Sequence, residues 1–127
     1  LGCVGLALKI ALSLRRIEQL RGRMLNLRRR YRERRELYER ALQAAGKLSE
    51  RDRKLAQDRL AELRQHGREL IDDLRALMDD IGAVKKEILA KLGESADAKI
   101  SRKLAPFTEV EQEIEQLIAQ IGATFAD

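Results

Sequence analysis

The sequence predicts an all-α protein, a long antiparallel coiled-coil helical hairpin with a shorter third helix packed at its base, much like a three-helix bundle. The composition is rich in Leu, Ala, Glu, Arg and Gln, with 3% aromatic residues and one Pro. This excludes sandwiches, barrels and α/β enzymes, which need aromatic and β-branched strands. Apolar residues make up 44%, too many for a disordered chain, and recur at alternating spacings of three and four. We expect one helical domain over 1–127.

The first helix is predicted over about 4–46, because a heptad pattern with apolar core positions a and d runs through this segment. Its a positions are Ile10, Ile17, Met24, Tyr31, Tyr38 and Ala45, and its d positions are Leu6, Ser13, Leu20, Leu27, Arg34, Ala41 and Leu48. The polar d position Arg34 has two interpretations, a side chain that bends outward along its stem or one that meets an acid of a second molecule.

A turn is predicted over about 46–52, because the heptad register changes by one residue between the first two segments. Gly46 can end a helix through a positive φ, and Ser49 with Asp52 offers an N-cap and an acidic first turn. The second helix is then expected over about 52–92, antiparallel to the first. Its a positions are Leu60, Gly67, Leu74, Ile81 and Ile88, and its d positions are Leu63, Leu70, Leu77, Val84 and Lys91.

Charges at the g positions predict the register of this hairpin, because g positions face each other in antiparallel coiled coils. The expected pairs are Lys9 with Glu87, Arg16 with Asp80, and Arg23 with Asp73. The same register places the large side chain of Tyr31 opposite Gly67. Exposed pairs contribute about 0.2–1 kcal/mol each, so they select register more than they stabilise.

A third helix is predicted over about 106–125, after a loop and short turn over about 93–105. Pro106 suits a first helical turn, where its missing N–H is not needed. Its apolar positions are Phe107, Val110, Ile114, Leu117 and Ile121, flanked by acids that include Glu111 and Glu113. We expect it to cover the e positions of the hairpin, which are Leu14, Arg21, Arg28, Arg35 and Leu42 on the first helix and Ile71, Met78 and Leu92 on the second. The candidate residues for contact with a partner helix are Ile71, Met78, Glu111 and Glu113.

The most conspicuous feature is an arginine run in a chain whose charge is graded along its length. The net charge of +5 divides into +9 for 1–48, zero for 49–92 and −4 for 93–127. One interpretation pairs these arginines with the other two helices, and the other gives them an anionic partner. Arg29, Arg32 and Arg40 are expected to point outward and remain free. The candidates for an anionic surface are Arg28, Arg29, Arg32, Arg35 and Arg40.

Among anionic partners the sequence favours a membrane over nucleic acid. Single-strand binders combine basic grooves with aromatic platforms, and both tyrosines here occupy core positions. The apolar stretch 1–14 lies directly before two arginines, as at the cytoplasmic end of a membrane span, yet it is shorter than the roughly 20 residues a span needs. Two interpretations remain open for 1–14, an ordinary part of the hairpin or a membrane-proximal segment whose anchor has been removed.

No constellation in the sequence indicates catalysis. His66 lacks ligand neighbours and is expected at the solvent edge facing Arg30, and the pairs Asp72–Asp73 and Asp79–Asp80 diverge by about 100° on a helix. We expect no cofactor, no metal and no small-molecule substrate. A single cysteine, Cys3, excludes an intrachain disulfide and is most simply a small apolar core residue.

The sequence thus predicts a non-enzymatic coiled-coil scaffold or adaptor that self-associates as a dimer or binds a partner helix. An anionic membrane is a further expected partner, with a curved, membrane-binding dimer as one concrete form, in the cytoplasm or at the cytoplasmic face of a membrane. The alternative is a nucleic-acid-binding hairpin that uses sequence-independent phosphate contacts. The sequence leaves the oligomeric state open, including a domain-swapped dimer.

Overall fold

Three helices account for nearly all of the chain in the computed structural model. They are α1 (Gly2–Ala45), α2 (Glu50–Leu92) and α3 (Asp97–Thr124). The structure describes the backbone of residues 2–92 and 97–126, and the side chains of 15–90 and 102–126. The side chains of Lys9, Leu14 and Leu92, and the whole apolar stretch 1–14, therefore lie outside the described side chains. No helix in the described part is long and apolar enough to cross a membrane.

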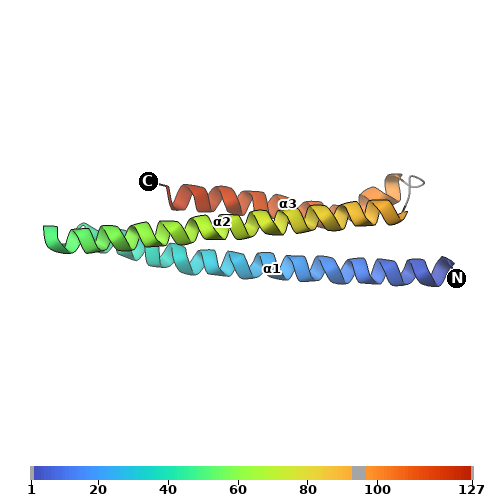
Figure 1. The fold of residues 1–127 in the computed structure, drawn as a ribbon, viewed down its shortest axis with the longest axis horizontal. Helices are drawn as coiled ribbons and strands as arrows, with labels where there is room; N and C mark the ends of the chain where they lie inside the picture. Colours follow the sequence, from blue (N-terminus) through green and yellow to red (C-terminus); the bar gives the residue numbers. More distant parts are fainter. Residues whose placement is uncertain (1, 93–96, 127) are drawn as a thin grey trace.

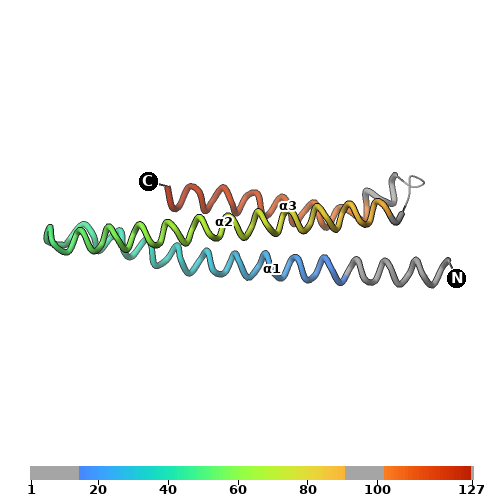
Figure 2. The backbone as a smooth tube through the Cα atoms, in the orientation of Figure 1, coloured from blue at the N-terminus to red at the C-terminus, as the bar shows by residue number. Residues whose placement is uncertain are grey.

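The helices form an elongated three-helix bundle in which α2 runs alongside both other helices (Figure 1) and α1 also contacts α3. α1 and α2 are antiparallel, and α3 folds back along α2 so that it runs in the direction of α1. α3 ends before it reaches the α1–α2 turn, so a two-helix tip extends beyond a three-helix base (Figure 2). The predicted all-α hairpin with a third helix at its base is confirmed.

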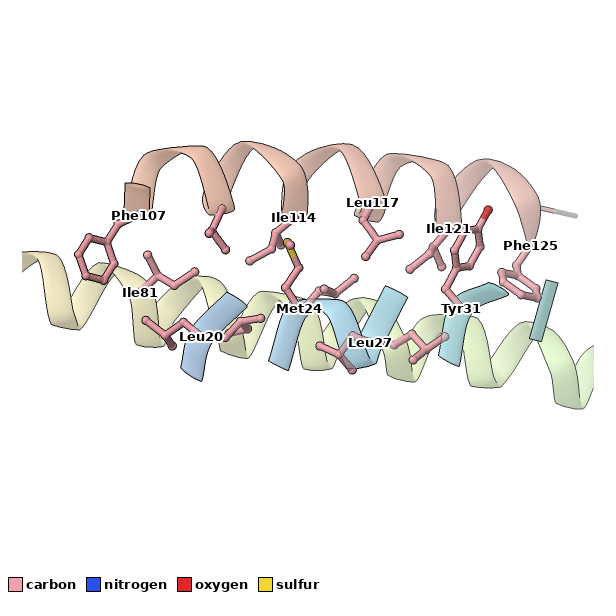
Figure 3. Packing of buried hydrophobic residues seen from close by; sticks show 14 of the residues in the cluster. Leu20, Met24, Leu27, Tyr31, Ile81, Phe107, Ile114, Leu117, Ile121 and Phe125 are labelled. Carbon is pink, nitrogen blue, oxygen red and sulfur yellow. The ribbon is translucent and has the colours of Figure 1, made fainter. Parts of the chain in front are cut away.

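One apolar core holds the three helices together. Figure 3 shows Met24 and Leu27 of α1 and Ile81 of α2 facing the apolar side of α3. No polar or charged side chain is buried among the described residues. Burial of apolar side chains therefore supplies the stability, at about 25 cal/mol per Å² removed from water. The buried residues are Ile17, Leu20, Met24, Leu27, Tyr31, Tyr38, Leu60, Leu63, Leu70, Leu74, Leu77, Ile81, Ile88, Phe107, Val110, Ile114, Leu117, Ile121 and Phe125.

The turn between α1 and α2 is shorter than the predicted 46–52. The Lys47 amide donates to the Ala44 carbonyl at 3.1 Å, and the Arg53 amide donates to the Ser49 carbonyl at 2.8 Å. Ser49 is thus the N-cap, as predicted, although its hydroxyl donates to the Asp52 carboxylate at 3.0 Å. The expectation of a positive φ at Gly46 is wrong, because that residue does not adopt the left-handed backbone. The turn instead closes through the Lys47 bond.

The predicted ion-pair register is wrong by one heptad, although the hairpin is right. Arg16 pairs with Glu87, Arg23 with Asp80 at 2.7 Å, and Arg30 with Asp73 at 3.7 Å. The reason is that helical side chains lean toward the N-terminus of their own helix. Those of α1 therefore lean away from the turn and those of α2 toward it. Each arginine therefore pairs with an acid of α2 that lies one heptad farther from the turn than the acid predicted for it.

The start of α3 also differs from the prediction, since the helix begins at Asp97 and continues through Pro106. A proline inside a helix lacks the N–H that would bond to the carbonyl four residues earlier, here that of Arg102. The Thr108 hydroxyl donates to the Leu104 carbonyl at 3.3 Å, within the turn that contains the proline. Leu104 packs against the core and Phe107 is buried. Packing on α2 therefore stabilises helix on both sides of Pro106.

The C-terminal end of α3 packs against the place where Gly67 lies on α2. A Cβ atom on Gly67 would lie 2.7 Å from Cδ2 and 2.8 Å from Cγ of Phe125. Tyr31 was predicted to lie opposite Gly67, and the atoms nearest to the added Cβ belong to Phe125, whose ring contacts that of Tyr31. The Phe125 ring contacts the rings of Tyr31 and Tyr38, with centroid separations of 6.3 and 5.0 Å. Helix α3 is thus fixed at its end by an aromatic cluster over a glycine.

The prediction that α3 covers Leu42 is wrong. Because α3 ends beside Tyr38, it does not reach Leu42, which stays 48% exposed on the two-helix tip.

A candidate anion-binding groove between α1 and α3

The arginine surplus of α1 lies on its two flanks, not on its outer face. Among the outward positions b, c and f of residues 15–43, four arginines are balanced by four glutamates. These are Arg15, Arg29, Arg32 and Arg40, and Glu18, Glu33, Glu36 and Glu39. The g flank carries arginines toward α2, and the e flank carries arginines toward α3. A broad basic outer face, which would suit a flat anionic surface, is therefore not what α1 offers.

The g-flank arginines are used within the hairpin. Arg16, Arg23 and Arg30 each pair with an acid of α2, as described above. These side chains are between 44% and 51% exposed, so the pairs contribute little stability and mainly select the register. The structural interpretation of the arginine run is therefore correct for this flank.

Two e-flank arginines, Arg28 and Arg35, together with Arg32 from the adjoining outward position b, open onto a groove of about 320 Å³ between α1 and α3. Its α1 wall carries three arginines at positions 28, 32 and 35, which the helical repeat places in one row. Its α3 wall carries two glutamine amides and one carboxylate. The lining residues are Arg28, Tyr31, Arg32, Arg35, Glu113, Gln116, Leu117 and Gln120.

The three groove arginines are held differently. Arg28 approaches Glu113 at 3.8 Å, a distance too long for a hydrogen bond. The Arg35 guanidinium lies 5.4 Å from the centroid of the Tyr31 ring, a cation–π contact that uses its face and leaves its N–H edge available. Arg32 forms no hydrogen bond or ion pair with any residue whose side chain the structure describes. The groove thus has unused guanidinium donors.

The floor of the groove is held by a hydrogen bond and by aromatic packing. The Tyr31 hydroxyl and the Thr124 hydroxyl are hydrogen-bonded at 2.7 Å, which ties the centre of α1 to the last residue of α3. Tyr31 is also buried against Phe125. The ring beneath Arg35 and the end of α3 are thus tied to each other across the two walls. Such preorganisation lowers the entropic cost of binding a ligand.

The expectation that Arg29, Arg32 and Arg40 all remain free is wrong for two of them. Arg29 donates to the Asn26 side-chain oxygen at 2.8 Å, and Arg40 pairs with Glu36 at 3.2 Å. Both partners lie one turn away on the same helix, an arrangement that the heptad comparison between helices does not detect.

The residues predicted to contact a partner helix contact the chain's own helices. Ile71 and Met78 are half-buried and pack against the shared core. Glu111 accepts a bond from Lys85 of α2 at 2.6 Å, and Glu113 faces Arg28 of α1. The acidic flanks of α3 thus meet a cation on each of the other two helices. The helix predicted to cover the e positions is α3 itself.

Side chains of the types that bind metals do not cluster in the described part of the chain. No group of three or more His, Cys, Asp and Glu side chains there converges on a metal site. His66 is half-buried with an unpartnered Nδ1, and its expected neighbour Arg30 pairs with Asp73 instead. Asp80 is held by Arg23.

The sequence indicated the α1 wall of the groove but missed the α3 wall. Gln116 and Gln120 are four residues apart and therefore share a face of α3, which is the only sequence signal for them. Tyr31 was recognised as a core residue and not as the ring beneath Arg35. The chain matches no known family model, and comparison with curated proteins and with solved structures gives no match.

Proposed function

We propose that this chain is a non-enzymatic coiled-coil scaffold that associates with anionic membrane surfaces through the groove between α1 and α3. The observation that carries this proposal is the groove itself, in which three arginines face one carboxylate. An anionic headgroup would enter the groove and use guanidinium donors that the protein leaves unpaired. Arg28, Arg32 and Arg35 are the contact residues in this proposal.

The scaffold part of the proposal is supported by the elongated shape and the apolar core. An elongated bundle with a projecting two-helix tip offers separate surfaces along one axis (Figure 1). Self-association as a dimer, including a curved form, is compatible with such a shape and is retained as part of the proposal. Partner helices would have to bind outside the e positions of the base, because α3 covers these.

Nucleic-acid binding through the same arginines is the second candidate. A duplex presents one negative charge per roughly 1.7 Å of its axis. Binding to it therefore needs basic side chains spread over an extended protein surface. On α1 the outer face is close to charge-balanced, and Arg28, Arg32 and Arg35 gather in one groove. This distribution favours a single anionic group over an extended polyanion.

The test is co-sedimentation of the full chain with vesicles of phosphatidylcholine, with and without phosphatidylserine, in the presence of a DNA duplex as competitor. The proposal predicts binding to the anionic vesicles that survives the duplex. The double variant Arg32→Glu/Arg35→Glu should lose this binding. The matched control is Arg29→Glu/Arg40→Glu, which makes the same change of net charge on the outer face and should retain most of it.

Two results would contradict the proposal. Equal loss in both double variants would mean that net charge, not the groove, drives the association. Binding that the duplex abolishes would assign the arginines to nucleic acid. Circular dichroism of each variant shows whether helicity is preserved, so that unfolding is not mistaken for lost binding.

A further inference from the structure

We infer that the groove is a site for one phosphate monoester group, presented either on a membrane headgroup or on a soluble compound. This inference rests on the proposed function and adds to it the chemistry of the group that the groove binds. It is carried by the charge and the donor geometry of the groove.

The charge of the groove matches a dianion. Arg28, Arg32 and Arg35 supply three positive charges, and Glu113 is the one acid among the lining residues, which leaves a formal surplus of two. A phosphate monoester carries about −1.5 to −2 at pH 7. A carboxylate or a phosphodiester carries one negative charge and would leave half of this surplus uncompensated.

The donors are arranged for an acceptor with several oxygens. Residues 28, 32 and 35 follow one another at helical spacings of four and three, so their guanidinium groups line one wall. Each guanidinium can offer two parallel N–H donors to a phosphate. Gln116 and Gln120 lie on the opposite wall, where their amide groups can donate to further oxygens.

The existing contacts leave these donors available. Arg32 has no partner among the residues whose side chains are described, and the Arg28–Glu113 separation of 3.8 Å is beyond hydrogen-bond range. Arg35 uses the face of its guanidinium on Tyr31, so its edge can still bind an oxygen. A bound phosphate would therefore add hydrogen bonds without breaking any that the structure shows in the groove.

The test uses the full chain, inorganic phosphate and dimethyl phosphate, a monoanion with the phosphodiester charge. Nuclear magnetic resonance follows the arginine Nε–H signals as each compound is added. We expect inorganic phosphate to shift the signals of Arg28, Arg32 and Arg35 but not that of Arg29, and dimethyl phosphate to bind at least about tenfold more weakly. Equal binding of the two compounds, or shifts spread evenly over all arginines, would overturn the inference.

Two variants separate a binding site from a structural cluster. Arg32→Gln should weaken phosphate binding at least about tenfold, because it removes charge-assisted donors. Glu113→Gln should strengthen binding by about fivefold, because it removes the one acid among the lining residues. A gain of affinity cannot result from unfolding, so unchanged or weaker binding in Glu113→Gln would overturn the inference even if Arg32→Gln behaves as expected.

Vesicles distinguish the source of the phosphate and separate this inference from the proposed function. Vesicles with phosphatidylinositol 4-phosphate, which has a monoester, are compared with phosphatidylserine vesicles of the same total charge. Preference for the monoester vesicles supports both proposals. Phosphate binding in solution with no binding to either vesicle supports the site and contradicts the membrane. Equal binding to both vesicles without binding of inorganic phosphate overturns the site and leaves the proposed function in place.

Discussion

The substitution Gly67→Ala tests the packing of α3 most sharply, because two opposing effects meet at one position. Gly67 lies within α2, where alanine is favoured over glycine by about 1 kcal/mol. The new Cβ would, however, lie 2.7 and 2.8 Å from ring atoms of Phe125 and 3.2 Å from its Cβ. The close approach includes the base of the side chain, so a rotation of the ring does not relieve it.

The magnitude follows from what Phe125 would lose. Forcing an extra methyl group into a packed core costs about 1–3 kcal/mol. If the ring leaves its place, the protein loses about 1.5–3 kcal/mol of apolar burial and about 0.5–1.5 kcal/mol for each aromatic pair. These losses exceed the gain in helix propensity. After the propensity gain of about 1 kcal/mol is subtracted from the overpacking cost, we expect Gly67→Ala to lower the free energy of unfolding by up to about 2 kcal/mol.

The matched control is Gly82→Ala on the same helix, where nothing lies within 4 Å of the added Cβ. This variant should raise the free energy of unfolding by about 0.5–1 kcal/mol. Urea unfolding followed by circular dichroism at 222 nm measures both variants. The two identical chemical changes on α2 are thus expected to have opposite signs.

The background variant Phe125→Ala completes the test. Without the ring, Gly67→Ala should become stabilising by about 1 kcal/mol, because only the propensity gain remains. The reasoning is refuted if Gly67→Ala stabilises the intact chain as Gly82→Ala does. It is also refuted if its effect is the same with and without the Phe125 ring.

Three further experiments test the ion-pair register, the start of α3 and the hydrogen bond between α1 and α3. A double-mutant cycle between Arg23 and Asp80 should give a coupling free energy of about 0.2–1 kcal/mol, whereas a cycle between Arg23 and Asp73 should give none. The reverse result would mean that the ion pairs form in the register predicted from the sequence. Because the proline lies inside α3, Pro106→Ala should raise the free energy of unfolding by up to about 3 kcal/mol. No change in urea unfolding would mean that α3 begins at Pro106. Tyr31→Phe should lower the free energy of unfolding by about 0.5–1.5 kcal/mol through loss of the hydroxyl bond to α3, and an unchanged midpoint in urea would show that this bond adds nothing.

Heptad spacing in the sequence was enough to predict the hairpin and the face that α3 covers. Spacing records which residues share a face, and Met24, Leu74 and Ile114 are buried as their positions require. It does not record how far a side chain leans along its helix. That is why the g-flank pairs were predicted one heptad from where they form.

The ends of α3 could not be predicted from local signals. Pro106 indicates a helix start, and this signal is overridden by packing of Leu104 and Phe107 on the core. Phe125 lies four residues after Ile121 and so continues its face, but its place over Gly67 depends on the level at which α3 meets α2. Both features depend on tertiary contacts and not on neighbouring residues.

The sequence predicted the arginine wall of the groove but not its glutamine wall. The arginine run indicated an excess of positive charge, and Arg28, Arg32 and Arg35 were among the candidates. Arg29 and Arg40 bind partners on their own helix, Asn26 and Glu36, and a comparison of heptad positions between helices does not detect such pairs. The glutamine wall depends on which face of α3 meets α1, which the spacing of two isolated polar residues does not determine.

In this structure the groove forms because α3 packs on the hairpin of its own chain, and the ion pair between Lys85 and Glu111 allows this packing to be measured directly. Their charged atoms lie 2.6 Å apart, within reach of a zero-length carbodiimide cross-link between an amine and a carboxylate. The measurement mixes natural-abundance and ¹⁵N-labelled chains after joint refolding, cross-links them, and identifies the linked peptides by mass spectrometry. The neighbouring Lys86, which is exposed, is the control and should not link to Glu111. The account predicts Lys85–Glu111 links in which both halves carry the same isotope, whereas mixed-isotope links, or none at this pair, would contradict it.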